Sequence, residues 1–155
     1  MKVAPEIAHD RQPGGTAPTA ARPGWVWDLP TGPEGAGFAR RALDGALTAL
    51  GVGRDARADA RLMVSEIATN AHRHAAGLGP YELWLHDTPD GLRVSVFDRD
   101  ARVDITGYSW TSGDHGRGLG IVAELSGGRW GVAAARARLG DRAAGKAVWF
   151  AVPPG

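Results

Sequence analysis

The chain has 155 residues, a net charge of +1 and no cysteine. This length fits one domain with a sizeable core. The near-neutral charge gives no argument for a strongly anionic partner such as a nucleic acid or a membrane surface, and the lack of cysteine excludes disulfides and thiolate catalysis. No apolar run is as long as a membrane span, and the N-terminus lacks the apolar core of a signal peptide, so we expect a soluble cytoplasmic protein.

The N-terminal part of the chain differs in composition from the rest. Residues 1–23 are rich in Pro, Gly, Ala and Thr and offer little apolar surface to bury, which predicts a disordered tail. We expect the folded domain over residues 24–155. It begins with WVWDLP, where Trp25, Trp27 and Leu29 alternate as in a half-buried strand.

The remaining elements follow in a regular order. Apolar residues at helical spacing predict a helix that ends at Gly51, and a second helix from a capping Asp55 to about Ala76. YELWLHD and LRVSVFD, joined by TPDG, predict a hairpin, and residues 99–115 a long loop. A glycine-rich segment then leads into a short helix, followed by two closing strands. The predicted fold is an α+β two-layer sandwich, with helices on one face of a mixed, mostly antiparallel sheet.

The second predicted helix contains SEIATNAHRHA, residues 65–75, where polar residues interrupt an apolar segment. Because each residue turns a helix by about 100°, Glu66, Asn70 and His74 fall on one narrow stripe. The other side should pack on the sheet, and it comprises Val64, Ile67, Ala68, Ala71 and Ala75. A polar stripe most commonly faces water, so a solvated surface is the alternative to a functional site.

The polar residues of this stripe suit phosphoryl transfer. Asn costs about 0.5 kcal/mol relative to Ala inside a helix, so its presence needs a reason. The amide oxygen of Asn70 can ligate Mg²⁺ together with phosphates, and the carboxylate of Glu66 can accept a proton from an attacking hydroxyl or water.

Two downstream segments supply further candidates. GDHGRGLGIV, residues 113–122, has glycines that let backbone N–H groups approach an anion at the start of a helix, although a flexible turn is the alternative interpretation. Asp98 ends the strand VSVFD, where its carboxylate can accept a hydrogen bond from the amino group of adenine. An ordinary strand-ending Asp is the alternative there.

Taken in order, SEIATNAHRHA, VSVFDRDAR, HGRGLGIVAELSGGRWGV and GKAVWFAVP resemble the GHKL ATPase superfamily. More narrowly, they resemble its anti-sigma factor serine/threonine kinase branch, a group of histidine kinase-like ATPases. The first motif resembles the N-box of the family: Glu, three residues, Asn, then a basic residue and His. The resemblance covers residues 25–153 and implies a Bergerat-type α/β sandwich that binds ATP and Mg²⁺ between helices and a mobile lid.

The resemblance implies a role for each matched residue. Glu66 would be the catalytic base and Asn70 the ligand of Mg²⁺, while Arg73 and His74 would contact phosphate or shape the pocket. Asp98 would recognise adenine. The residues that would wrap the phosphates are Gly116, Arg117, Gly118, Leu119 and Gly120.

The implied activity is that of a kinase regulating transcription: it phosphorylates a Ser or Thr of an anti-sigma factor antagonist and otherwise sequesters a sigma factor. The sequence departs from the family pattern at two places. The usual Asp-x-Gly-x-Gly is DRDAR, with Asp100 and Arg102 in place of glycines, which narrows the adenine pocket. Ala147 stands where the last strand often carries a hydroxyl residue, which removes one contact to the base. Residues 99–115 would be the lid.

Two alternatives to this function stay open. The first is a non-catalytic partner-binding module of the same fold with weak or lost nucleotide binding. The missing glycines favour it, whereas the intact pair of Glu66 and Asn70 favours the kinase. The second is a kinase-like fragment of a histidine-kinase pathway, against which counts that no phosphoacceptor helical hairpin precedes the domain.

Histidines and tryptophans raise two further questions. Four histidines suggest a metal site: His72, His74, His86 and His115. His72 and His74 are two apart and face different sides of a helix, which disfavours a shared zinc ion. Most of the six tryptophans occupy alternating strand positions and are expected in the core. Relatives often dimerise through N-terminal elements, so Trp25 and Trp27 are candidates for a homodimer contact.

Overall fold

The structure is a computed structural model, which describes residues 4–6, 24–75, 79–100 and 113–154, and the side chains of these residues except those of 4–6, 74 and 113–118. The helices are α1 (Gly35–Ala49), α2 (Arg54–Ala75) and α3 (Gly113–Leu125). The strands are β1 (Ala4–Glu6), β2 (Gly24–Leu29), β3 (Tyr81–Thr88), β4 (Gly91–Asp98), β5 (Trp130–Arg136) and β6 (Ala144–Ala151).

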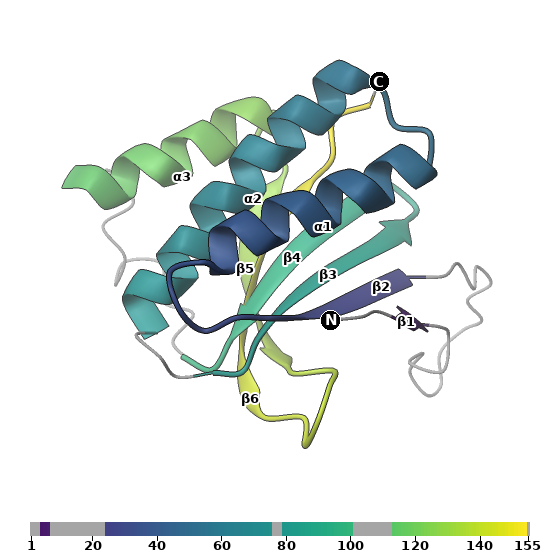
Figure 1. The fold of residues 1–155 in the computed structure, drawn as a ribbon. Coiled ribbons are helices and arrows are strands. Elements are labelled where there is room, and N and C mark those ends of the chain that lie inside the picture. Colours follow the sequence, from purple (N-terminus) through teal and green to yellow (C-terminus); the bar gives the residue numbers. More distant parts are fainter. Residues whose placement is uncertain (1–3, 7–23, 76–78, 101–112, 155) are drawn as a thin grey trace.

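The described strands form one sheet in the order β1-β2-β3-β4-β6-β5. Figure 1 shows the three helices side by side over one face of this sheet. Because β6 lies between β4 and β5, the chain crosses from β4 through α3 to the edge strand β5 and returns as a hairpin. The predicted α+β sandwich is confirmed. The sheet is not mixed, since every described strand pair is antiparallel.

The main core lies between the helices and the sheet. Its fully buried members include Leu43, Leu47, Met63, Ile67, Leu83, Leu85, Val94, Val96, Val122 and Phe150. Burial of each such large side chain contributes about 1.5–3 kcal/mol. The five residues predicted to form the apolar side of α2 are all buried, so that prediction is confirmed.

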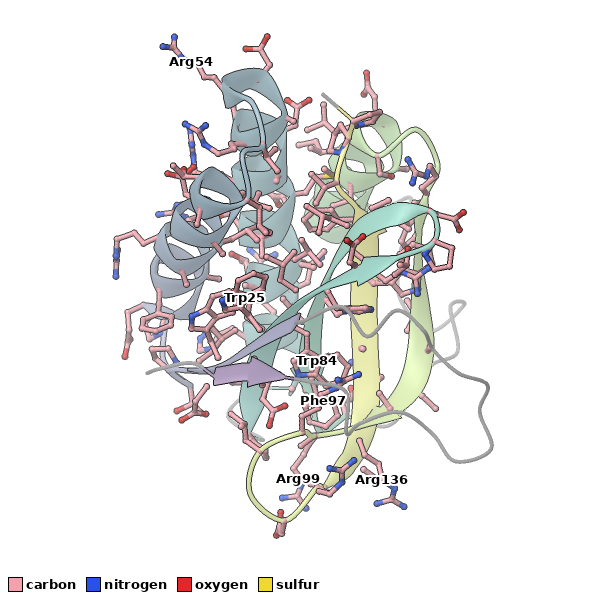
Figure 2. All side chains as sticks on the ribbon, turned by 90° about the vertical axis from the view of Figure 1, so that its right-hand side faces the viewer. Trp25, Arg54, Trp84, Phe97, Arg99 and Arg136 are labelled. Atoms are coloured by element: carbon pink, nitrogen blue, oxygen red, sulfur yellow. The ribbon has the colours of Figure 1, made fainter. Side chains whose placement is uncertain are left out.

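A smaller core covers part of the opposite face of the sheet. It comprises Val26, Trp84, Phe97, Ala137 and Ala147. The rings of Trp84 and Phe97 stack with centroids 5.8 Å apart, and Figure 2 shows them together on this face. The connection from β5 to β6 is held there because the buried carboxylate of Glu82 accepts hydrogen bonds from the backbone N–H groups of Arg138 (2.8 Å) and Leu139 (3.1 Å).

Element ends differ from the sequence predictions in a few places. Gly51 ends α1 with φ of 82°, as predicted, but α2 begins at Arg54, so Asp55 lies in the first helical turn instead of capping it. Residues 4–6 of the expected tail form β1 against β2. Such a short strand depends on backbone hydrogen bonds to an open sheet edge, which composition does not reveal.

The predicted homodimer contact needs revision at Trp27, which is buried against the helices. Trp25 is half-buried and packs against the same core, between the helices and the sheet in Figure 2. None of the helices in the described part of the chain is long and apolar enough to span a bilayer.

Candidate functional site

Helix α2 carries the predicted catalytic pair on the side that faces α3. The helix packs against α1, α3 and β4. Arg40 of α1 donates a hydrogen bond to Ser65 (2.9 Å), which identifies the side of α2 that faces α1. From the helical turn of about 100° per residue, Glu66 and Asn70 point away from α1 and toward α3. Both side chains are half-buried.

The amide of Asn70 is incomplete as a hydrogen-bonding group. Its nitrogen Nδ2 is buried and has no hydrogen-bond partner among the described residues. A buried donor without a partner costs about 1–3 kcal/mol, so such an atom indicates a place where a group from outside completes the site. A half-turn of the amide exchanges nitrogen and oxygen, so this position can serve a phosphate oxygen or a divalent cation.

The other two residues predicted on this helix contribute less. Arg73 is exposed on α2. The side chain of His74 lies outside the described residues, and its predicted contact with phosphate stays a prediction.

Asp98, at the end of β4, forms a buried ion pair with Lys146 of β6. The Nζ atom of Lys146 lies 2.9 Å from Oδ1 and 3.0 Å from Oδ2 of Asp98, and both side chains are 1% exposed. The backbone N–H of Asp100 donates a third hydrogen bond to Oδ1 (2.8 Å). Burial raises the pKa of Asp98 above its ordinary value, and the Lys146 ammonium opposes this rise without cancelling it.

Strand register brings these two charges together. Asp98 pairs with Lys146 directly across the two strands. Since side chains alternate between faces, Lys146 lies on the same face as Phe150, which is in the core under the helices. Gly145 makes the approach possible, because a Cβ at this position would overlap the backbone carbonyl of Asp98. Ala147 lies on the opposite face, in the small core.

The glycine-rich segment is helical from Gly113, not a loop. A helix leaves only the N–H groups of its first turn without an internal partner, and Gly118 and Gly120 lie beyond that turn. The N–H groups of Gly118 and Gly120 therefore belong to the helix in this conformation. The side chain of Leu119 is buried in the main core. The side chain of Arg117 and residues 101–112 of the predicted lid lie outside the described residues, and the last three residues of that lid belong to α3.

A comparison with known families decides what kind of domain this is. A family model described as a histidine kinase-like ATPase domain matches residues 29–127, more than half of the chain. The chain belongs to the histidine kinase-like ATPase family. The predicted resemblance is thereby confirmed at the level of the family. The matched range includes Glu66, Asn70 and Asp98, and it ends before β5 and β6.

The fold is also found among solved structures. The chain is similar to a chain in the crystal structure of the SiaB–SiaC complex from Pseudomonas aeruginosa, with a TM-score of 0.50 and 18% identity. The alignment covers 81% of this chain and 86% of that one. At this identity the similarity supports the fold alone. No curated protein sequence matches the chain significantly.

Membership of an ATPase family implies ATP binding, and the two ends of the nucleotide fit this chain unequally. At the phosphate end, the unpartnered amide of Asn70 fits a phosphate oxygen or Mg²⁺. At the base end, the carboxylate of Asp98 is already occupied by an ammonium and a backbone N–H. The residues therefore fit the phosphates and do not fit the adenine amino group.

Sequence reasoning did not identify Lys146 as part of the site. The signal was present in GKAVWFA, where Lys146 shares its alternation with Val148 and Phe150, the apolar residues of the inward face. A lysine at an inward position needs a buried anion, because a fully buried lysine is almost never unpaired.

A separate pocket of about 130 Å³ lies on the α1 side of α2. Pro30, Gly35, Ala71, His72 and Val96 are among its lining residues. It contains none of the predicted site residues, and it lies across α2 from Asn70. In the described part of the chain, no cluster of three or more His, Cys, Asp or Glu side chains is placed to hold a metal ion.

Proposed function

We propose that this chain is an ATP-dependent protein serine/threonine kinase of the anti-sigma type. Its substrate would be a Ser or Thr hydroxyl of an anti-sigma factor antagonist, and in the absence of that substrate it would sequester a sigma factor and so regulate transcription in the cytoplasm. The observation that carries the proposal is the buried, unpartnered amide of Asn70, one helical turn from the half-buried Glu66, within the part of the chain that matches the ATPase family.

The roles of the two residues follow from their chemistry. ATP, when bound, supplies the phosphoryl group that is transferred. Asn70 would hold the phosphate end through its amide oxygen and Mg²⁺, which fixes the direction of attack. Glu66 would accept the proton of the attacking hydroxyl, because its carboxylate lies one turn away on the same side of α2. Arg73, exposed at the end of α2, would attract the charged phosphates.

The assignment of an anti-sigma factor antagonist as the partner comes from the resemblance of the sequence motifs to anti-sigma kinases. The solved SiaB–SiaC complex, which has a similar fold, is an assembly of two proteins, and this is compatible with partner binding by the present chain. A homodimer is a further proposal, for which Trp25 is the remaining candidate contact.

Variants of the two α2 residues test the kinase proposal, because the residues have different roles. Glu66→Gln should keep Mg²⁺–ATP binding and lose phosphate transfer by about 10²- to 10⁴-fold. Asn70→Ala should weaken both binding and transfer. The matched control is Asp59→Asn, a half-buried carboxylate two turns from Glu66 on the same helix, which should change neither.

The measurements are calorimetric titration with Mg²⁺–ATP and transfer of labelled phosphate to a purified antagonist, with circular dichroism as a folding control. If Glu66→Gln transfers phosphate as fast as the unchanged protein, Glu66 is not the base. If either variant unfolds, the polar stripe is structural.

A second candidate function is a partner-binding module without catalysis. The ion pair between Asp98 and Lys146 favours it, because it occupies the carboxylate that would otherwise recognise the base. This candidate predicts tight binding of the partner, no phosphate transfer, and equal partner binding by Glu66→Gln and Asn70→Ala. The same experiment therefore separates the two functions.

A further inference from the structure

We infer that Lys146 replaces the adenine amino group as the donor to Asp98, so that the nucleotide site does not recognise the amino group of the base. The inference rests on the nucleotide site of the proposed function, and it makes Lys146 a residue that determines specificity. It predicts a site that holds nucleotides through their phosphates and is indifferent to the amino group at position 6 of the purine.

The first argument is that the carboxylate of Asp98 is buried and already has a charged partner. Each of its oxygens accepts a hydrogen bond from the ammonium of Lys146, at 2.9 and 3.0 Å. Oδ1 also accepts from the backbone N–H of Asp100 at 2.8 Å. The carboxylate and the ammonium are each 1% exposed, so water does not weaken their attraction.

The second argument is that a purine cannot exchange with Lys146 at equal cost. The amino group of adenine is neutral, whereas the ammonium carries a full charge, and charge-assisted hydrogen bonds are about twice as strong as neutral ones. Displacement would leave a buried ammonium with Asp100, whose carbonyl oxygen lies 3.4 Å and whose Oδ2 lies 4.0 Å from Nζ. Both contacts are longer than those to Asp98.

The third argument is that the backbone fixes Lys146 in this place. Gly145, the preceding residue, approaches the carbonyl of Asp98 so closely that no side chain fits there. The paired register of β4 and β6 sets the two charges opposite each other. The ammonium therefore belongs to the sheet and is not carried by a loop that could swing aside.

The test compares ATP with the triphosphate of purine riboside, which lacks only the amino group. Each is titrated with Mg²⁺ into the full-length protein and into Lys146→Ala, and the dissociation constants are measured by calorimetry. We expect the two ligands to bind the unchanged protein within about threefold of each other. In Lys146→Ala, ATP should bind at least about tenfold more tightly than the purine analogue, the usual effect of one hydrogen bond to a charged group.

Glu82→Gln is the matched control. It alters a buried carboxylate on β3 that faces the small core on the other side of the sheet, so it tests whether a loosened sheet alone changes the ratio. The ratio in this control should equal that of the unchanged protein. If Lys146→Ala does not fold, the unchanged protein and Asp98→Asn decide, since the inference requires the same ratio near one in both.

Each outcome has a definite meaning. Preference of the unchanged protein for ATP by tenfold or more, lost in Asp98→Asn, overturns the inference and leaves the kinase proposal intact. Binding of neither ligand by the unchanged protein, with preferential binding of ATP by Lys146→Ala, supports the replacement of the adenine amino group by Lys146 and refutes both the binding through phosphates and the kinase proposal. Binding of neither ligand by a folded Lys146→Ala overturns the inference, because Lys146 would then not be what withholds Asp98.

Discussion

Replacement of Lys146 by Met should destabilise the protein far more than replacement of both members of its ion pair. Lys146 and Asp98 are each 1% exposed, so Lys146→Met leaves a buried carboxylate whose remaining described donor is the N–H of Asp100. Loss of one partner of a buried pair costs about 3–5 kcal/mol. We expect a loss in this range, a large share of the stability of a domain, which is about 5–15 kcal/mol.

The structure predicts an asymmetry between the single variants. Asp98→Asn leaves the ammonium of Lys146 with its contacts to Asp100, at 3.4 Å from the carbonyl oxygen and 4.0 Å from Oδ2, so it should cost less than Lys146→Met. The double variant, which combines Asp98→Asn with Lys146→Met, buries neither charge of the pair. Uncharged replacements of buried pairs are often nearly neutral, so the double variant should lie within about 2 kcal/mol of the unchanged protein.

The pH dependence of Lys146→Met has a definite sign. Burial already raises the pKa of Asp98, and removal of the opposing ammonium raises this pKa further. The folded state then binds the proton more tightly than the unfolded state, whose carboxyl has a pKa near 3.8. Stability is therefore retained below about that pH and lost as the pH rises toward the folded-state pKa. The deficit of the variant should be small near pH 4 and grow toward pH 7.

Urea denaturation followed by circular dichroism measures the free energies of unfolding at about pH 4, 5.5 and 7. The proteins compared are the unchanged protein, Lys146→Met, Asp98→Asn and the double variant. Two results would refute the reasoning. One is a Lys146→Met variant whose free energy of unfolding at pH 7 lies within about 1 kcal/mol of that of the unchanged protein, since a buried carboxylate without its ammonium should cost more. The other is a double variant as unstable as Lys146→Met, which would mean that the stem of Lys146, and not its charge, holds β6.

Three further outcomes follow from the structure. Gly120→Ala should stabilise α3 by about 0.5–1 kcal/mol, because an added Cβ would meet no described atom within 4 Å. If the segment must unwind around phosphate, the same variant should also weaken Mg²⁺–ATP binding. Gly45→Ala on α1, where an added Cβ is equally unobstructed, is the control and should stabilise the protein without changing that binding. Burial raises the pKa of Asp44, but the hydrogen bonds and charges of Arg57 and Arg61 outweigh this effect and hold the pKa below 3.8. Asp44→Asn should therefore lower the free energy of unfolding by about 1 kcal/mol or less at pH 7. Chemical denaturation at a pH well below the pKa of Asp44 should show no difference between the variant and the unchanged protein. Deletion of residues 1–23 should change the unfolding free energy by about 1 kcal/mol or less, measured in the same way; a larger loss would show that β1 and the residues after it contribute to the core.

Most of the fold could be predicted because its signals are local. Trp25, Trp27 and Leu29 recur at every second position, and this period of two indicates a strand whose face with these residues packs on the core. The apolar residues of α2 recur with helical spacing, and all of them are buried. The antiparallel order of every strand pair could not be predicted in the same way, because it depends on where β6 inserts, and no local pattern records that.

At the start of α3, burial of apolar side chains outweighs the low helix propensity of the glycines. Gly116, Gly118 and Gly120 each cost a helix about 1 kcal/mol relative to Ala, which favours a loop. The structure is helical there, and the helix buries Leu119 and Val122 in the main core. Burial of two such side chains contributes about 1.5–3 kcal/mol each, enough to offset the glycines. The balance is close, which is why the sequence predicts a loop and the tertiary contacts yield a helix.

The base end of the site was the least predictable part for a related reason. Alternation along GKAVWFA assigns Lys146 to the inward face, but it does not say which residue of a strand 48 positions away lies opposite. A shift of one residue would place Ala147 beside Asp98 and turn Lys146 outward. Gly145 opposes such a shift, because glycine is the one residue type that can lie against the carbonyl of Asp98 in the observed register. The close approach of Gly145 to Asp98 thus places Lys146 opposite this carboxylate, and Lys146 occupies the group that would otherwise be free to bind a base.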